Sequence, residues 1–198
     1  MASVAALLLL LKMIPTTSLL ALAAPRENRK VARALLEERF AKLLAQNQAS
    51  LTRLASSYTR GRSDRDDLLQ EIAMGLWLAL PGFREECSDR TFLFRIAHNR
   101  CITHISRRRN TEPLDEHEHQ LADSTPPVES RIDADQRSQD LRLAIRKLPM
   151  HYHQVVVLAL EGMDYREISA VLGISESNVG VRLNRARALL KTALGDST

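Results

Sequence analysis

The stretch DYREISAVLGISESNVGVRLNRARALL, residues 164–190, contains two short helical patterns separated by Gly173-Ile174-Ser175. Asp164 and Glu167 have the spacing of a capping box, which predicts the start of the first helix. Gly173 can adopt the left-handed conformation that ends a helix, and Ser175 is a typical cap for the next one. The stretch therefore predicts a helix, a tight turn and a second helix that runs to about Ala193.

The second of these helices has one apolar side and one polar, basic side. At about 100° per residue, one face gathers Val179, Leu183, Ala186 and Leu190, which we expect to pack inward. The outer face carries Ser177, Gly180, Val181, Asn184 and Arg185, flanked by Arg182 and Arg187. Two helices joined by a glycine-containing turn form the helix-turn-helix arrangement, which lays its second helix in the major groove of DNA. The combination of caps, apolar spacing and one-sided basicity favours this interpretation over a solvated helix of an ordinary bundle.

The side chains on the outer face suit particular groups of DNA. Arg185 can donate to two acceptors of a guanine, Asn184 can bind an adenine edge, and Val181 can touch a thymine methyl group. Basic side chains at the flanks suit phosphates, which position the protein without reading sequence. The residues predicted to contact duplex DNA are Ser177, Val181, Arg182, Asn184, Arg185, Arg187 and Lys191.

The whole chain has the composition of a helical protein that binds a polyanion. Of its 198 residues 44% are hydrophobic and only 4% aromatic, and the apolar residues recur at threes and fours rather than in alternation. We therefore expect an all-α fold. The net charge of +4 is unevenly distributed, because basic residues concentrate at 107–109 and near the C-terminus while residues 112–135 are mainly acidic.

The first 24 residues, MASVAALLLLLKMIPTTSLLALAA, are apolar and carry Lys12 as their only charged side chain. A signal peptide would have its positive charge before the apolar stretch, although Ala21-Leu22-Ala23 resembles a cleavage site. A membrane span would be destabilised by Lys12 and Pro15 at its centre. The third interpretation, which we favour narrowly over a genuine membrane-seeking extension, is that translation starts downstream, at Met13 or later.

Hydrophobic periodicity divides the rest of the chain into helices. One or two helices are expected from Arg29 to the break at Gly61. Asp64 then precedes a helix with a stripe of Leu68, Ile72, Leu76 and Ala79, ended by Pro81-Gly82, and a third helix is expected from Thr91 to about Arg109. Further helices are expected over residues 138–147, stopped by Leu148-Pro149, and over 151–161, stopped by Gly162.

Residues 110–135 contain three prolines, many acids and little periodicity, which predicts a flexible linker. The predicted organisation is thus an apolar N-terminal extension over 1–25, a helical domain over 26–109, a flexible acidic linker over 110–136 and a second helical domain over 137–195. The linker acids are expected to be solvated, with masking of the basic surfaces as the alternative.

The helix expected from Thr91 to Arg109 also has two different sides. One side, expected to be buried, carries Leu93, Phe94, Ala97, Cys101 and Ile105. The other carries Phe92, Asn99, Thr103 and Ser106, with Arg95, Arg100 and Arg107 beside them. An aromatic ring among small polar and cationic groups suits the binding of single-stranded bases. Two alternatives remain: Phe92 in the core, and Arg107 to Arg109 as a solvated helix end favoured by the helix dipole.

The sequence carries no motif of an enzyme. It has no P-loop, no dinucleotide-binding glycine pattern and no nucleophile-base-acid spacing, so we expect no catalytic activity, no cofactor and no small-molecule substrate. His98, Cys101 and His104 do not converge on a helix, since the two histidines are about 120° apart, and we expect no metal site. His117 and His119 are expected to be exposed linker residues. Cys87 and Cys101 are expected to be reduced thiols of a cytoplasmic protein.

Three segments in order, DRDDLLQEIAMGLW, FLFRIAHNRCITHISRRR and the C-terminal stretch from RKLPMHYHQ to ARALL, resemble the bacterial RNA polymerase sigma factors of the sigma-70 family, extracytoplasmic-function (ECF) group. Such factors consist of two helical domains, regions 2 and 4, joined by a linker. The resemblance covers roughly residues 45–194. It is specific because two unrelated patterns occur in the right order, whereas the helix-turn-helix alone would fit many regulators.

The resemblance implies a cytoplasmic transcription initiation factor that binds core RNA polymerase, through the β′ clamp helices and the β flap, and promoter DNA. It also implies an anti-sigma factor as a partner. The residues that it places on the surface docking the β′ clamp helices are Asp66, Asp67, Gln70 and Glu71. Those that it places at the melted −10 element are Phe92, Arg95, Asn99, Arg100, Thr103, Arg107 and Arg108. The outer face of the last helix would read the −35 element as duplex.

Four positions depart from the family pattern. Gly180 replaces a basic residue, Thr103 an aspartate, Phe92 a tryptophan and His153 an arginine. The alternative function is a two-domain helix-turn-helix regulator, with or without a membrane tether, that acts without replacing a sigma factor. The acidic DDLLQE segment would have no role in such a regulator, although a solvated helix N-terminus also explains its acids.

Overall fold

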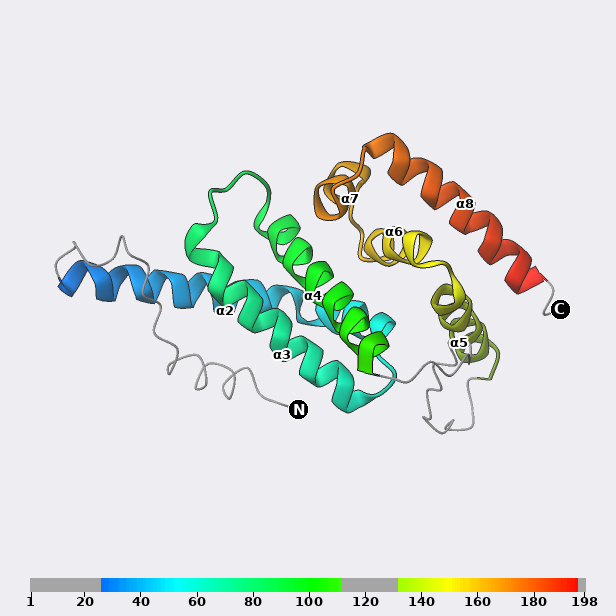
Figure 1. Cartoon of the computed structure of the whole chain (residues 1–198), viewed down its shortest axis with the longest axis horizontal. Coiled ribbons are helices and arrows are strands. Elements are labelled where there is room, and N and C mark those ends of the chain that lie inside the picture. The colour runs from blue at the N-terminus through cyan, green and yellow to red at the C-terminus, as the bar shows by residue number, and fades with distance from the viewer. Residues whose placement is uncertain (1–25, 112–131, 196–198) are drawn as a thin grey trace.

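The computed structural model describes residues 26–111 and 132–195, and every regular element in these two ranges is a helix (Figure 1). The all-α prediction is confirmed. The elements are α2 (Arg26–Tyr58), α3 (Arg62–Ala79), the 3-10 turn η2 (Leu80–Gly82), α4 (Asp89–Thr111), α5 (Ile132–Lys147), α6 (Met150–Leu160), α7 (Tyr165–Leu172) and α8 (Glu176–Gly195). Within the described ranges, no helix has both the length and the apolar composition needed to cross a membrane. The apolar segment 1–25 lies outside them, as do His117 and His119.

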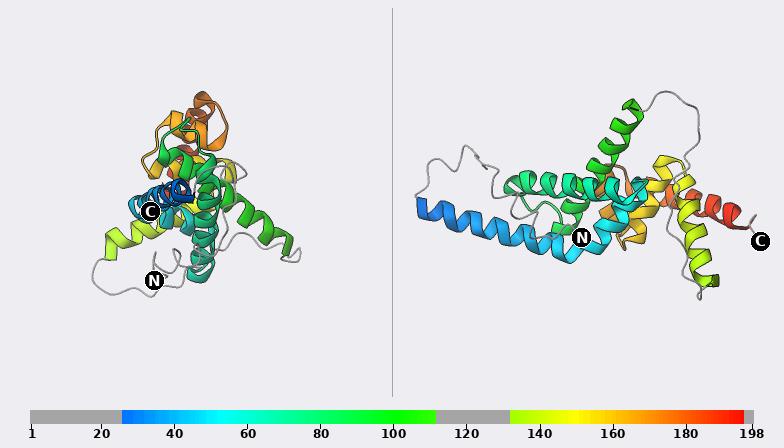
Figure 2. Two further views of the ribbon diagram at one scale, coloured as in Figure 1. Left: turned by 90° about the vertical axis from the view of Figure 1, so that its left-hand side faces the viewer. Right: turned by 90° about the horizontal axis from the view of Figure 1, so that it is seen from below.

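Helices α2, α3 and α4 form the first bundle. The predicted stripe of α3 is buried at Leu68, Ile72 and Leu76 and half-buried at Ala79. Phe40 of α2 meets the edge of Trp77 of α3, with ring centroids 5.3 Å apart. Where one or two helices were expected, α2 is a single helix of 33 residues. Its N-terminal part extends beyond α3 and α4 (Figure 2).

The start of α3 differs from the prediction by three residues. The helix begins at Arg62 with Gly61 at the N-cap, so Asp64 lies in the first turn rather than before it. The Asp64 carboxylate accepts a hydrogen bond from the backbone N–H of Arg60 at 3.2 Å. Asp64 therefore still satisfies a backbone donor at the helix start, from inside the helix.

Helices α5 to α8 form the second bundle, and its turn follows the predicted chemistry. Glu167 N donates to Asp164 Oδ1 at 2.8 Å and Asp164 N donates to Glu167 Oε2 at 3.0 Å, which completes the capping box. Gly173 ends α7 in the left-handed conformation, with φ of 67°. Ser175 Oγ accepts from Asn178 N at 3.3 Å and caps α8. These predictions are confirmed.

The predicted bounds of the linker were wrong at both ends. Helix α4 continues to Thr111, and α5 begins at Ile132 rather than at residue 138. Between Pro127 and Pro149 the sequence has neither proline nor glycine. No residue therefore prevents α5 from including the acidic residues at its N-terminal end. Residues 112–131 lie outside the described residues.

The two bundles are packed against each other. Helix α7 lies against α4 (Figure 1), and α6 lies against the C-terminal part of α2. The buried apolar side chains of both bundles belong to one continuous cluster, which includes Leu54 and Tyr58 of α2 and Val157 of α6. The position of the second bundle is therefore fixed by side-chain packing as well as by the connecting chain.

Candidate nucleic-acid interface

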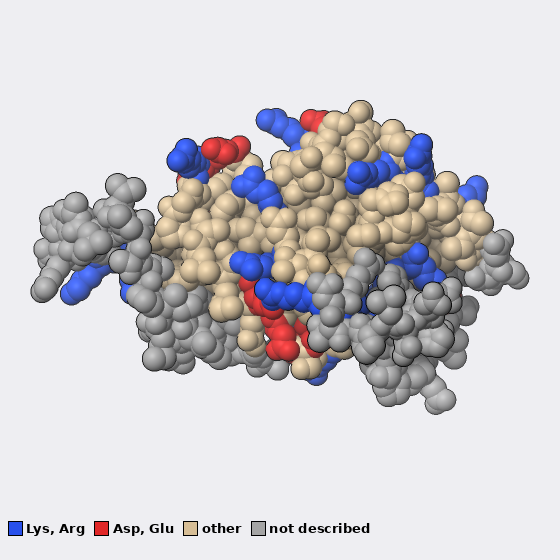
Figure 3. Space-filling model, viewed as in Figure 1, with Lys and Arg blue, Asp and Glu red and all other residues tan. Residues whose placement is uncertain are grey.

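Helix α8 presents the outer face that the sequence predicted. Val179, Leu183 and Ala186 are at most 3% exposed, whereas Val181 is 49% exposed. The helix packs against α5, α6 and α7, which fixes the side that remains open to solvent. Among the residues predicted to contact duplex DNA, Ser177, Val181, Asn184, Arg185, Arg187 and Lys191 are exposed and Arg182 is half-buried. Basic side chains are spaced along this helix in Figure 3.

Hydrogen bonds along α8 orient part of this face. Arg182 Nε donates to Asn178 Oδ1 at 3.0 Å, which holds the guanidinium along the helix. Arg187 Nη1 donates to Asn184 Oδ1 at 3.4 Å, a long and weak bond that a DNA acceptor can replace. The Arg185 side chain makes no hydrogen bond or ion pair to any described residue, so its guanidinium is available to a ligand.

Gly180 has a packing role that the sequence did not indicate. A Cβ atom at this position would lie 3.3 Å from Cε2 of Tyr165, the first residue of α7. The absence of a side chain at Gly180 therefore lets the Tyr165 ring lie close to the backbone of α8.

Helix α4 exposes part of its predicted nucleic-acid face. Asn99 and Ser106 are exposed, and Thr103 is half-buried with its Oγ1 donating to the Asn99 carbonyl oxygen at 2.9 Å. On the opposite side Leu93, Phe94, Ala97 and Cys101 are fully buried, as predicted, and Ile105 is half-buried.

Phe92 lies in the core, the alternative that the sequence pattern left open, and not on the exposed side of α4. This ring is only 6% exposed because it stacks on Phe83, with centroids 4.1 Å apart and ring planes 20° from parallel. Cations cover the outer sides of the stack: Arg39 lies 5.2 Å from the Phe83 centroid and Arg95 lies 5.8 Å from the Phe92 centroid. Phe92 therefore anchors the segment before α4 and does not present an open ring to a base.

Arg100 lies across α3 rather than pointing straight outward. A Cβ at Gly75 would lie 2.8 Å from Arg100 Nε and 3.1 Å from Ile96 Cγ2, so the glycine makes room for both side chains. Sequence reasoning missed Gly75. A glycine inside a helix of good helix formers was the available signal, since it destabilises the helix by about 1 kcal/mol and calls for a packing reason.

Acidic side chains of α3 meet basic side chains at the C-terminal end of α4, and Figure 3 shows the two colours side by side there. Arg107 Nη1 lies 3.2 Å from Glu71 Oε1, and Arg108 Nη1 lies 3.9 Å from Asp64 Oδ2. Asp64 Oδ1 also lies 2.8 Å from His104 Nε2. The basic end of α4 is thus partly neutralised within its own bundle.

The predicted polymerase-docking residues of α3 fall into two groups. Asp67 and Gln70 are exposed, as expected of a docking edge. Asp66 and Glu71 are half-buried, Asp66 beside Arg65 at 3.2 Å and Glu71 beside Arg107. Asp67 has no ion-pair partner among the described residues, so it is the carboxylate of this set that is most available to a partner.

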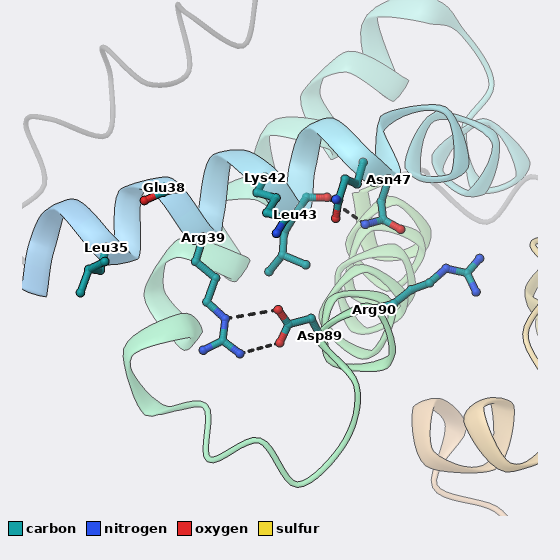
Figure 4. A pocket seen from close by; sticks show the side chains of 9 residues that line it. Leu35, Glu38, Arg39, Lys42, Leu43, Asn47, Asp89 and Arg90 are labelled. Atoms are coloured by element: carbon teal, nitrogen blue, oxygen red, sulfur yellow. Dashed lines mark hydrogen bonds and ion pairs between the residues drawn. The ribbon is translucent and has the colours of Figure 1, made fainter.

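A groove of about 770 Å³ lies between α2 and the first turn of α4 (Figure 4). Arg39 crosses it, with Nη2 2.6 Å from Asp89 Oδ1 and 3.0 Å from Glu85 Oε1. The lining mixes both charges with apolar side chains such as Leu35 and Leu43. The ion pairs of Arg39 join α2 to the start of α4, which is a structural role.

The residues considered as metal ligands have other environments. Cys101 and His98 are 0% and 8% exposed, and His104 faces Asp64. Within the two described ranges, no group of three or more His, Cys, Asp and Glu side chains could hold a metal ion. Cys87 and Cys101 are free thiols, and burial raises the pKa of Cys101, so this thiol stays protonated at neutral pH.

Two family models match the chain, one for each bundle. The model described as Sigma-70 region 2 matches residues 43–111, and the model described as Sigma-70, region 4 matches residues 138–190. The first range contains α3, α4 and the second half of α2, and the second contains α6, α7 and most of α5 and α8.

Characterised relatives are similar over most of the chain. The ECF RNA polymerase sigma factor SigM of Mycobacterium tuberculosis (strain H37Rv) is 31% identical over 159 residues, which cover 79% of this chain and 77% of SigM. The RNA polymerase sigma factor CnrH of Cupriavidus metallidurans is 31% identical over 164 residues, which cover 78% of this chain and 86% of CnrH.

Solved structures agree with these relationships. CnrH in complex with the cytosolic domain of CnrY has a TM-score of 0.61 and 28% identity, covering 80% of this chain and 89% of that one. The sigma factor RpoE from Bartonella quintana, in complex with the anti-sigma factor NepR, has a TM-score of 0.64 and covers 79% of this chain and 96% of that one; at 20% identity it supports the fold alone. Because both region models match in order and two relatives at 31% identity cover 79% and 78% of the chain, this protein belongs to the ECF sigma factors of the sigma-70 family, non-enzymatic transcription initiation factors that direct RNA polymerase to promoters through regions 2 and 4.

Proposed function

We propose that region 4 reads the −35 element as duplex through the outer face of α8, while region 2 holds unpaired −10 bases on the exposed side of α4. The observation that supports this most directly is the exposure of Val181, Asn184 and Arg185 on one side of α8. On the opposite side of the helix, Val179 and Leu183 are buried. A recognition helix needs this division, because its buried side fixes the orientation of the side that enters the groove.

Individual roles on α8 follow from the chemistry of the side chains. Arg185 donates to a guanine, Asn184 binds an adenine edge after releasing its weak bond to Arg187, and Val181 contacts a thymine methyl group. Four further residues contact phosphates: Ser177, Arg182, Arg187 and Lys191. These contacts fix where α8 lies on the DNA and do not decide which sequence it prefers.

On α4, Asn99 and Thr103 are the polar groups available to unpaired bases. Positively charged side chains beside them can neutralise phosphates of the DNA strand; they are Arg95, Arg100, Arg107 and Arg108. Phe92 is not part of this contact set. Its stack with Phe83 supports the start of α4 from inside region 2.

Selectivity for promoter DNA arises because regions 2 and 4 bind to the same polymerase molecule. Asp67 and Gln70 dock the β′ clamp helices together with Asp66 and Glu71, and region 4 docks the β flap. Tethering raises the effective concentration of each weak DNA contact, so two modest contacts add into specific recognition. Melting follows from preferential binding of the open strand, which shifts the population of open promoter without ATP.

The chain acts in the cytoplasm, where polymerase and promoters are, and is controlled there by an anti-sigma protein. Support for the second statement comes from the solved relative CnrH, which was captured in complex with the cytosolic domain of CnrY. The inducing signal would then act on the partner rather than on this chain.

The test is run-off transcription with purified core polymerase and a fragment from upstream of the protein's own gene. We expect a defined transcript only when core enzyme and this chain are both present. The control is the charge-reversed variant Asp67→Lys. This variant should give no transcript, because it binds core polymerase more weakly, while its region 4 should bind duplex DNA as the parent does. Absence of any transcript on this fragment and on a genomic promoter library would contradict the proposal.

A further inference from the structure

Helix α2 has an apolar side toward the core and a polar side toward solvent for as long as it packs against α3 and α4. Leu36, Phe40 and Leu43 lie on the side that packs into the core. Glu38 and Lys42 lie on the opposite side and are exposed. This division is the one expected of a helix at the surface of a bundle.

The division is inverted in the N-terminal part of α2, which extends beyond α3 and α4 in Figure 2. At about 100° per residue, Val31 and Leu35 lie on the side that faces solvent further along the helix. They are large apolar side chains, 58% and 61% exposed. By the same count, Arg29 and Arg33 lie on the side that faces the core further along. The N-terminal part of α2 therefore has an apolar face of its own, which the bundle does not cover.

This part of the helix is also strongly basic. Residues 26–36, RENRKVARALL, contain four cations and one acid, a net charge of +3. Lys30 and Arg33 are exposed, and the one printed contact of Arg33 is an exposed ion pair with Glu37 of the same helix at 2.9 Å. Basic side chains around an exposed apolar face are the pattern of a helix that lies on an anionic membrane.

The apolar residues 1–24 directly precede this face in the chain. They include eight leucines, at positions 7–11, 19, 20 and 22. Val31 and Leu35 alone offer too little apolar surface to cover them, whereas a lipid bilayer can cover both the segment and the helix face. Lys12 and Pro15 oppose a membrane span, but they do not oppose a segment that lies at the membrane surface. There a lysine can extend its amine to the headgroups.

We propose that residues 1–24 and the N-terminal part of α2 form a membrane-binding surface, which holds the factor on the cytoplasmic face of an anionic lipid bilayer. The inverted face of α2 supports this proposal over the downstream translation start, because a second apolar surface continues into the described residues. The proposal goes beyond promoter reading, since it concerns where the chain lies before it meets polymerase. It is independent of which bases α8 recognises.

The apolar half of the surface is tested by Val31→Gln/Leu35→Gln in the full-length chain. Both side chains are exposed, so their replacement leaves the core of region 2 intact. Co-sedimentation with vesicles of phosphatidylcholine mixed with phosphatidylglycerol should show binding by the parent and binding about tenfold weaker or less by this variant. Leu141→Gln/Leu143→Gln is the matched control and should bind as the parent does, because these exposed leucines belong to α5.

The basic half is tested by Lys30→Gln/Arg33→Gln. Loss of two cations near the lipid surface should weaken binding to the mixed vesicles by about tenfold, and pure phosphatidylcholine vesicles should bind parent and variant equally weakly. Arg142→Gln/Lys147→Gln removes the same charge from exposed positions of α5 and should bind as the parent does. In Figure 1, α5 and the start of α2 lie at opposite ends of the molecule.

Four results would overturn the proposal. The parent could fail to bind either kind of vesicle, or it could bind both kinds equally well. The control variants on α5 could weaken binding as much as those on α2. Sedimentation without lipid could show that Val31 and Leu35 mediate self-association, which would make a second copy the occupant. Finally, mass spectrometry of the native protein should find peptides from before Met13, and a native chain that starts at Met13 or later would contradict the proposal.

Discussion

Arg107 of α4 lies against Glu71 of α3, with Nη1 and Oε1 3.2 Å apart, so the proposed −10 surface and the proposed docking edge are joined by an ion pair. The two side chains are 63% and 32% exposed. An exposed pair of this kind contributes about 1 kcal/mol or less to stability. Its main effect is therefore on where positive charge is available to DNA.

This pair predicts opposite effects of two substitutions on single-stranded DNA binding. Glu71→Gln should leave the free energy of unfolding within about 0.5 kcal/mol of the parent and strengthen binding to single-stranded DNA, because the Glu71 carboxylate no longer offsets the charge of Arg107. Arg107→Gln should weaken binding and reduce the slope of log K against log salt by about 0.7. Fluorescence anisotropy of a −10 oligonucleotide with holoenzyme, over a salt series, measures both. Lys42→Gln, on α2, is the charge-matched control, and a slope equal to the parent's in Arg107→Gln would contradict the assignment.

Arg185 and Lys191 should respond differently to truncation. Arg185→Ala should reduce discrimination at one base pair of the −35 element by roughly 1–3 kcal/mol, because it removes a two-acceptor contact with a base. Lys191→Ala should weaken all −35 sequences alike, because it removes a phosphate contact. Competition binding of holoenzyme to a set of single-base −35 variants separates the two patterns. An unchanged base preference in Arg185→Ala would contradict the recognition face.

Gly180→Ala should stabilise region 4. The substitution removes the helix penalty of glycine, about 1 kcal/mol, and brings a Cβ to 3.3 Å from Tyr165 Cε2. Tyr165 is 43% exposed at the start of α7, so its ring can shift by the few tenths of an ångström required. We expect a net gain of about 0.5 kcal/mol in thermal or urea unfolding. A loss of stability would mean that the Tyr165 ring cannot move.

Gly75→Ala should have the opposite effect on stability and destabilise region 2. Here a Cβ would lie 2.8 Å from Arg100 Nε and 3.1 Å from Ile96 Cγ2, inside the packed face between α3 and α4. Overpacking of this kind destabilises by about 1–3 kcal/mol, which exceeds the gain in helix propensity. Urea unfolding of Gly75→Ala and Gly180→Ala side by side should show shifts of the midpoint in opposite directions. Equal shifts would show that helix propensity alone decides both positions.

Features that depend on neighbours in sequence were predictable. The capping box of Asp164 and Glu167, the left-handed Gly173 and the buried spacing of Val179 and Leu183 each involve residues a few positions apart, and all are confirmed. Local backbone chemistry and helical periodicity are sufficient for such features. The exposed face of α8 follows from the same periodicity, which is why most of the candidate −35 site could be located without a structure.

Features that depend on tertiary contacts were not predictable. Phe92 fell on the polar side of its own helix, yet Phe83 covers it from the preceding loop. Arg100 and Arg107 are oriented by Gly75 and Glu71, residues of α3 distant in sequence. No periodicity within α4 contains this information, because it concerns which helix lies alongside. The ion pair between Arg53 of α2 and Glu161 at the end of α6 joins residues 108 positions apart, and the sequence could not predict it for the same reason.

His153 of α6 packs edge-on against Tyr58 of α2, with ring centroids 4.8 Å apart, and makes this contact between the two bundles depend on pH. Burial, followed by the nearby Arg146 guanidinium, lowers the pKa of His153 to about 4, and burial also lowers the pKa of His98. A histidine whose pKa is depressed in the folded state binds a proton more tightly when unfolded. Its contribution to stability is therefore present above pH 6.5 and is lost as the pH falls from 6.5 toward 4. Between pH 6.5 and pH 5 the expected loss from His153 is about 1.5 kcal/mol.

His153→Phe should remove this loss without disturbing the packing. A phenyl ring can replace the imidazole against Tyr58, with the loss of a weak polar contact between the imidazole and the Ser57 backbone. Urea unfolding at pH 7 and pH 5 should then show a smaller decrease in stability for the variant than for the parent, whereas His151→Phe, at an exposed neighbour, should follow the parent. Equal decreases in parent and His153→Phe would show that His153 is not buried as a neutral ring. The family pattern has an arginine at this position, and an arginine stays charged at all accessible pH values. A histidine can be neutral at neutral pH, so it can make a buried apolar contact with Tyr58 that an arginine cannot make.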